Sequence, residues 1–158
     1  MRCYPAILLA LGLLGASAAH ARTDEFLTNA IKGDNSETRL GRLAAERGAS
    51  SGVRSFGRML EGDHSAGRKE TVPIARRHHV TPPTAMADEA RKEYRKLQGL
   101  RGRDFDREFA RYMVDDHKKD ISEFEKEVRS GDPADVRALA RKTLPVLRKH
   151  LKTAQSLT

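Results

Sequence analysis

The chain has 158 residues, of which 38% are hydrophobic, 33% are charged and 5% are aromatic, and it contains one cysteine. This length suits one domain with a core of its own, and a single cysteine excludes a disulfide framework. The formal net charge is +8, but basic and acidic residues are interleaved in stretches such as "RKEYRK". Interleaved charge indicates the solvated surface of helices more than a dedicated basic binding stripe.

The first 21 residues have the pattern of a secretory signal peptide: one Arg, an apolar run over residues 6–14 and small residues ending in "AHA". The apolar run is too short for a permanent membrane-spanning helix. We therefore expect cleavage after Ala21, which also removes Cys3, and export of a mature domain over residues 22–158 to the periplasm. An uncleaved anchor is the alternative. We expect no nucleic-acid partner for an exported chain, whereas its positive charge suits anionic envelope components.

Apolar residues recur at helical spacing through the rest of the chain, and no stretch shows the alternation of a β-strand. We predict four long helices, with a short one between the second and the third, over residues 24–47, 51–78, 83–98, 105–129 and 133–156. Asp104 is expected to cap the third long helix, and Asp132 with Pro133 to start the last one. Pro73 and Pro145 fall inside helices and are expected to bend or shorten them.

The connections within the first and the second pair of long helices are only a few residues long, so each pair is expected to be antiparallel. The connection between the pairs is much longer, and its short helix would span about 21 Å at about 1.5 Å per residue. Such a segment can return the chain along the bundle, so that the second and third long helices run parallel. The sequence thus predicts an all-α, ferritin-like four-helix bundle with a short helix in a lengthwise crossover.

The segments "FGRMLEGDH" and "FARYMVDDH" repeat one pattern and end at His64 and His117. The two histidines lie on the apolar stripes of the second and third long helices, at matching distances from the helix starts. Glu37 and His150 lie on the apolar stripes of the first and last helices, at about the same level. In the predicted topology the four side chains converge in the middle of the bundle. Each needs a partner there, because burying a polar group unpaired costs about 1–3 kcal/mol.

Three imidazoles and a carboxylate are suitable ligands for Zn²⁺, Cu²⁺ or Fe²⁺ inside a helical bundle. Nearby carboxylates are candidates for the surrounding hydrogen bonds that orient the rings, namely Glu61, Asp63, Asp116 and Asp120. Asp63 and Asp116 directly precede the histidines and point about 100° away from them around the helix, so we expect these two to pair with Arg or Lys of a neighbouring helix. A buried Glu/His network that fixes the bundle without a metal is the alternative interpretation.

Three segments, "GRLAAERGASSGVRSFGRMLEGDH", "FDREFARYMVDDHKKDISEFE" and "TLPVLRKHL", together with the signal pattern, resemble the exported bacterial domain-of-unknown-function family 4142. The resemblance covers residues 24–158. The two Asp-His motifs of the family match at His64 and His117, its Leu-Pro…His motif at His150, and its acidic position on the first helix at Glu37. The resemblance implies a ferritin-like four-helix fold, and it implies no settled activity.

The resemblance does not extend to a di-iron centre. The usual centre of ferritin-like proteins needs Glu-x-x-His on two helices and a further Glu on each of the other two. Glu61 has this spacing to His64, but Val114 and Leu147 occupy the equivalent positions before the other two histidines. A histidine-rich and carboxylate-poor site favours Zn or Cu over di-iron.

We therefore expect an exported, non-catalytic protein that binds a transition metal in mid-bundle and serves metal handling or an envelope stress response. The alternative is a non-catalytic interaction module with a structural Glu/His network and a basic surface that docks on the envelope. A metal-dependent enzyme is a third hypothesis. It has less support, because the spacing of the polar residues along the sequence reveals no open ligand position and no general base. The chain also has no Gly-rich phosphate loop, nucleophile elbow or Cys–His pair.

Overall fold

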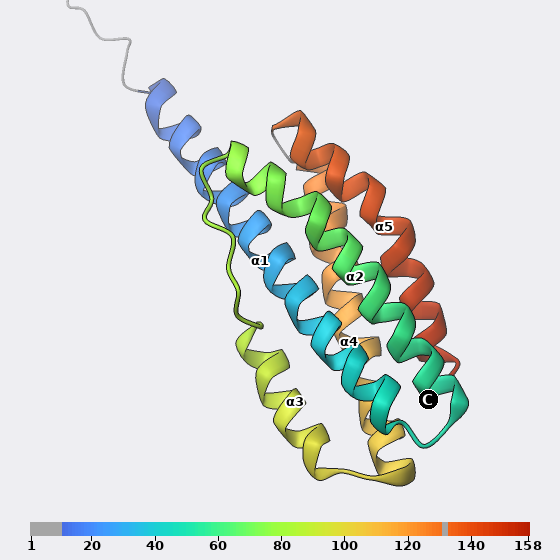
Figure 1. Ribbon diagram of the computed structural model, residues 1–158. Coiled ribbons are helices and arrows are strands. Elements are labelled where there is room, and N and C mark those ends of the chain that lie inside the picture. The colour runs from blue at the N-terminus through green and yellow to red at the C-terminus, as the bar shows by residue number, and fades with distance from the viewer. Residues whose placement is uncertain (1–10, 131–132) are drawn as a thin grey trace, which may run out of the picture.

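The computed structural model describes residues 11–130 and 133–158, and within these the chain forms five α-helices and no β-strand (Figure 1). The helices are α1 (Leu11–Arg47), α2 (Ser51–Arg77), α3 (Asp88–Gly99), α4 (Gly102–Ser130) and α5 (Ala134–Gln155). The four long helices form a bundle, and α3 packs beside α1 and α4.

The chain path is that of two antiparallel pairs joined by a lengthwise crossover. α1 and α2 are antiparallel neighbours, and so are α4 and α5 (Figure 1). The segment after α2 runs back along the bundle and continues through α3 to the end at which α2 began. α2 and α4 therefore start at the same end and run parallel, which confirms the predicted all-α bundle with its crossover helix.

The first helix is longer than predicted. α1 begins at Leu11 rather than at Asp24, and it continues through the expected cleavage position at Ala21. The reason is local, because Leu and Ala are among the strongest helix formers and no proline interrupts this stretch. Residues 1–10 of the expected signal peptide lie outside the described part of the chain, and cleavage stays a prediction. No helix in the described part is long and apolar enough to cross a membrane.

The crossover helix starts later than predicted, at Asp88 rather than at residue 83. The segment before it is held in a non-helical conformation by α1. The side-chain amide of Asn35 donates hydrogen bonds to the carbonyls of Pro83 (3.0 Å) and Ala85 (3.1 Å). Tertiary contacts therefore set this helix start.

Other helix ends differ from the predictions by a few residues. Asp104 lies in the first turn of α4 and not at its cap, and Pro133 is the N-cap of α5 rather than its first helical residue. Asp132, the predicted cap, lies outside the described residues. Pro73 and Pro145 do not end α2 or α5, because both helices continue through them.

A layer of buried polar residues divides the apolar core into two parts. On one side lie Leu40, Leu43, Val53, Phe56, Leu60, Phe105, Phe109 and Met113. On the other side lie Leu27, Ile31, Phe124, Val136, Leu139, Leu144 and Leu147. The layer itself consists of Glu37, His64, His117 and His150, and each of them falls between the two apolar groups along its own helix.

Two glycines allow α1 and α2 to approach closely beside this layer. A Cβ atom on Gly57 would lie 2.5 Å from the carbonyl oxygen of Gly41, and one on Gly41 would lie 2.6 Å from the carbonyl oxygen of Gly57. Gly41 is about one turn from Glu37, and Gly57 is about two turns from His64. This backbone contact therefore sets the spacing of the two helices where the polar layer begins.

Gly57→Ala should lower the free energy of unfolding by about 1–3 kcal/mol, because the new methyl group meets backbone atoms that cannot move aside without separating the helices. Gly62→Ala, in the same helix, is the matched control. Its Cβ would have no atom within 4 Å, and it should stabilise the protein by about 0.5–1 kcal/mol through helix propensity. Urea unfolding followed by circular dichroism measures both changes. Equal effects of the two substitutions would contradict the proposed helix contact.

Ionic contacts attach the crossover helix to α4. Glu108 of α4 forms ion pairs with Lys96 of α3, at 2.7 Å, and with Arg111 one turn further along α4. The hydrogen bond from Arg111 and a weaker contribution from Lys96 lower the pKa of Glu108 from 4.5 to about 2. Lys119 of α4 adds a second contact to α3 through Glu89, at 3.0 Å.

Glu108→Gln should destabilise the protein at neutral pH and lose this effect in acid. The folded-state pKa of Glu108 lies below its ordinary value, so its stabilising contribution is complete above pH 4.5 and is lost as the pH falls toward 2. The difference in urea midpoint between wild type and variant, measured from about pH 7 to about pH 3, tests this. A difference that stays constant over this range would show that the charge of Glu108 contributes nothing.

Candidate metal centre

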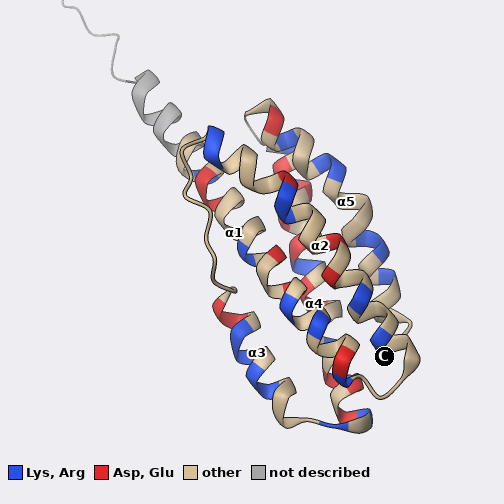
Figure 2. Cartoon of the chain, viewed as in Figure 1, with Lys and Arg blue, Asp and Glu red and all other residues tan. Residues whose placement is uncertain are grey.

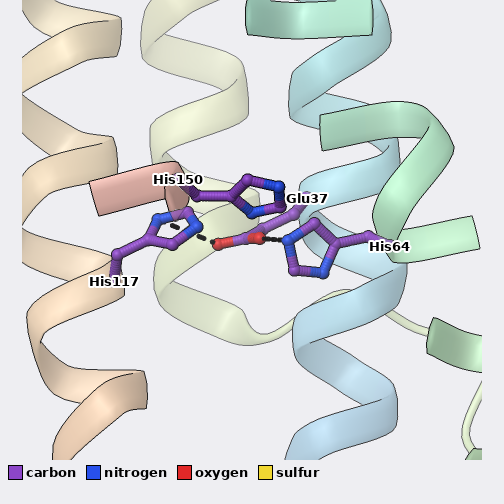
Figure 3. Close-up of side chains that lie close together, drawn as sticks. All are labelled: Glu37, His64, His117 and His150. Atoms are coloured by element: carbon purple, nitrogen blue, oxygen red, sulfur yellow. Dashed lines mark ion pairs between the residues drawn. The ribbon is translucent and has the colours of Figure 1, made fainter. Parts of the chain in front are cut away.

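One polar side chain from each long helix meets the others in the buried layer (Figure 3). Glu37 comes from α1, His64 from α2, His117 from α4 and His150 from α5. The ring centroid of His150 lies 5.2 Å from that of His64 and 5.3 Å from that of His117. His64 keeps 6% of its surface exposed and the other three side chains keep none. The four residues therefore share one level of the bundle, as the predicted topology requires.

Each imidazole has one nitrogen bonded to an acceptor outside this cluster. His64 Nδ1 donates to the Asp34 carboxylate at 3.0 Å, and His150 Nε2 donates to the Asp63 carboxylate at 2.9 Å. His117 Nδ1 donates to the main-chain carbonyl one turn earlier in α4, at 2.9 Å. A neutral imidazole that donates from one nitrogen carries a lone pair on the other. Outer acceptors of this kind orient the rings of metal-binding histidines.

The remaining donor atoms lie close together and lack hydrogen bonds. His117 Nε2 and His150 Nδ1 are buried without a hydrogen-bond partner, and His64 Nε2 is in ionic contact with Glu37 Oε2. Candidate ligand atoms, one from each of the four residues, lie within 4.8 Å of one another. Ligands bound tetrahedrally to zinc at about 2.0–2.1 Å lie about 3.3 Å apart. A modest contraction would therefore close the cluster around one ion.

The protonation states favour metal binding by two of the rings. Burial lowers the pKa of His117, and it lowers the pKa of His150 to about 4, so both rings are neutral at pH 7. Burial opposes the charge of His64 as well, but the Glu37 and Asp34 carboxylates raise the pKa of His64 well above its ordinary value. Burial would raise the pKa of Glu37, yet the neighbouring His117 and His64 rings lower it. The result is a buried ion pair of Glu37 with His64, next to two neutral imidazoles.

Two aspartates of α4, Asp116 and Asp120, lie beside Glu37 at the edge of the centre. With Glu37 they form a second group whose candidate ligand atoms lie within 4.8 Å of one another. Burial and the charge of Glu37 raise the pKa of Asp116 well above its ordinary value and that of Asp120 to about 7. Asp116 accepts a hydrogen bond from the Tyr112 hydroxyl at 3.4 Å, rather than from the Arg or Lys that helix geometry suggested.

Asp63 and Glu61 differ in their positions. Asp63 accepts the hydrogen bond of His150 and also lies 3.9 Å from Lys149, so it combines both expected contacts. Glu61 does not join the centre, because Arg42 of α1 lies opposite it and the two form a surface ion pair at 2.8 Å. The one Glu-x-x-His spacing in the sequence is therefore not used for the centre.

Asp34 is not among the residues expected at the centre from the sequence, although it forms one of the ring contacts. Asp34 lies on α1 one turn before Glu37, on the face toward α2, and its carboxylate holds His64 Nδ1. A Cβ atom on Gly67 of α2 would lie 3.1 Å from Asp34 Oδ1, so the glycine leaves room for this carboxylate. The spacing of two acids at i and i+3 was a visible indication, because such residues share one helix face.

Comparisons with known proteins agree with this fold. A family model described as a domain of unknown function (DUF4142) matches residues 11–157. A crystal structure of a DUF305 fragment from Deinococcus radiodurans is similar with a TM-score of 0.75 and 18% sequence identity, over 86% of this chain and 94% of that chain. At this identity the likeness shows the fold alone. No curated protein matches the chain.

Glu37→Ala should destabilise the protein without any metal, by about 3–5 kcal/mol, because it leaves the charge of His64 buried with less compensation. The double variant Glu37→Leu/His64→Leu should recover much of this loss, since it removes both charges and fills the space. Urea unfolding in the presence of a chelator measures both. Glu46→Ala, an exposed position of the same helix, is the control, and a Glu37→Ala cost as small as that of the control would contradict the ion pair.

Proposed function

The chain belongs to the DUF4142 family of domains of unknown function, and we propose that it binds one transition-metal ion in mid-bundle through Glu37, His64, His117 and His150. One observation carries the proposal. Each of the three rings is held from outside through one nitrogen, and the other nitrogens are buried in a common cluster where two of them lack a hydrogen bond. A bound ion would satisfy these atoms, and it would displace the proton of His64 that now pairs with Glu37.

The donor set favours zinc or copper. Imidazole nitrogens suit Zn²⁺ and Cu²⁺, and one carboxylate completes four ligands. A ferritin-like di-iron centre does not fit, because Glu61 faces Arg42 and because Val114 and Leu147 occupy the places of the other required acids. Four protein ligands leave no open position on a tetrahedral ion, which suits holding the ion better than catalysis.

We infer the cellular role from the signal-peptide pattern at the amino terminus. The signal-peptide features of residues 1–21 support export to the periplasm. A buried histidine-rich site in a small exported bundle suits metal handling or protection of the envelope under metal stress. In this role the protein sequesters the ion from water and from other ligands.

The rival function is an interaction module whose Glu/His cluster is purely structural. It is favoured by the ion pair of His64 with Glu37 and the hydrogen bond to Asp34, which satisfy this ring without a metal. The surface would then provide the function, through the Lys and Arg residues that are interspersed with acidic residues along the helices (Figure 2). Docking on anionic envelope components would be weakened by salt.

Metal titration of the chain, prepared without a histidine tag, separates the two functions. Zn²⁺ or Cu²⁺ should bind with one ion per chain and should raise the thermal midpoint in proportion to the logarithm of free metal over Kd. At a free concentration of about 100 times Kd, the stabilisation should reach about 2.7 kcal/mol. Each baseline is measured with a chelator present.

His117→Ala should abolish the metal-dependent shift of the midpoint. His79→Asn is the matched control, because His79 is exposed and has a positive φ of 61° that Asn tolerates. This variant should keep the full shift. A wild-type chain without any shift, or a shift that survives in His117→Ala, would favour the interaction module.

A further inference from the structure

A cavity of about 500 Å³ lies between α1 and α4, next to the histidine centre. Most of its walls come from residues 22–36 of α1 and 112–127 of α4, and residues at the start of α3, two residues of α5 and His64 of α2 complete the lining. Exposed side chains such as Glu25 and Glu123 also line it, so the cavity reaches the surface. His64 is also the member of the centre that keeps some exposure, 6%, whereas Glu37, His117 and His150 keep none.

The lining of the cavity has more acidic than basic residues, unlike the chain as a whole. It contains seven Asp and Glu residues and four Lys and Arg residues, whereas the whole chain has 22 acidic and 30 basic residues. Lys119 is paired with Glu89, another residue of this lining, at 3.0 Å, so the pair adds no net charge. A cleft lined by charge of one sign raises the local concentration of counter-ions and speeds their association. The formal excess of acids in this lining favours cations, whereas the chain as a whole carries a positive net charge.

The acids extend from the surface to the centre. Glu25, Glu123 and Glu127 lie toward the amino-terminal end of the described part of α1 and the carboxyl-terminal half of α4. Asp116 and Asp120 follow at the inner end, where their candidate ligand atoms lie within 4.8 Å of one another and of Glu37. Carboxylate oxygens along the whole path can replace water around a cation stepwise.

We propose that this cavity is the route by which a divalent transition-metal cation reaches the buried histidine centre. The inference rests on the proposed function, because it concerns filling of that same site. The inner carboxylates share Glu37 with the histidines and pass the cation to them. Zinc and copper are attracted by charge along the route and are selected by the imidazoles at its end.

Gly33 provides the space for this passage. A Cβ atom at Gly33 would have one neighbour within 4 Å, Asp120 Oδ2 at 3.9 Å. A large side chain at this position would therefore enter the cavity without meeting backbone. Gly62 of α2 has no neighbour within 4 Å and does not line the cavity, so it is a matched position for the same substitution.

Stopped-flow absorption of Cu²⁺ binding to the full chain tests the charge of the route. The variant Glu25→Gln/Glu123→Gln/Glu127→Gln should bind Cu²⁺ about 3- to 10-fold more slowly at low ionic strength. Its dissociation rate constant should stay unchanged. The difference should vanish at about 1 M salt, where the Debye length is about 3 Å. The control variant Glu46→Gln/Glu70→Gln/Asp104→Asn removes the same charge outside the cavity and should bind at the wild-type rate.

Gly33→Leu tests the passage itself. Blocking a route slows association and dissociation by the same factor, so both rate constants should fall while Kd stays within about twofold of wild type, as microscopic reversibility requires. Gly62→Leu should leave both rate constants unchanged. The two experiments probe charge and space separately.

The outcomes distinguish this inference from the proposed function. If the wild-type chain binds Cu²⁺ through His117, and neither the triple variant nor Gly33→Leu changes the association rate, the proposed route is wrong and the metal site stands. If the control triple variant binds Cu²⁺ as slowly as the cavity variant does, the charge of the cavity does not steer the cation. A wild-type chain that binds no Cu²⁺ overturns both proposals.

Discussion

A buried ion pair between Glu37 and His64 is the interaction on which the middle of the bundle depends. Moving a carboxylate and an imidazolium out of water costs several kcal/mol for each ion, and their attraction offsets this cost only when the remaining polar atoms are also bonded. Asp34 bonds the outer nitrogen of His64, and Glu37 Oε1 lies 3.6 Å from His117 Nδ1. The pair can form in only one register of α1 and α2, so it fixes how the two helices are aligned.

The backbone is adapted to this requirement. Gly41 and Gly57 bring α1 and α2 into backbone contact on one side of the layer, and large aromatic residues of α2 and α4, Phe56 and Phe109, pack below it with ring centroids 6.0 Å apart. The crossover places α2 and α4 parallel, and the same sequence pattern can therefore supply a histidine at one level from both helices. Apolar packing above and below keeps water away from the pair.

The polar layer is closed by packing on the side of α5, and a cavity adjoins it on the side of α1 and α4. Toward α5, the His150 ring is fully buried and held by Asp63. Toward α1 and α4, the acids of the cavity lie near one another, and burial together with mutual repulsion raises the pKa of Asp116 and Asp120. The cavity reaches the layer on this side, and the carboxylates of Asp116 and Asp120 lie next to Glu37 there.

Local patterns were enough to predict the order of the helices, the path of the chain and the four residues of the layer, although not every helix start. Helical periodicity is a local property, so it places Glu37, His64, His117 and His150 on apolar stripes, and connection lengths limit how the helices can be joined. The contacts of the surrounding acids, in contrast, depend on how the helices pack against one another. Glu61 turns to Arg42 while Asp63 turns to His150, because a side chain follows the partner that a neighbouring helix offers. The cavity, too, depends on the distance between α1 and α4, which no local pattern records.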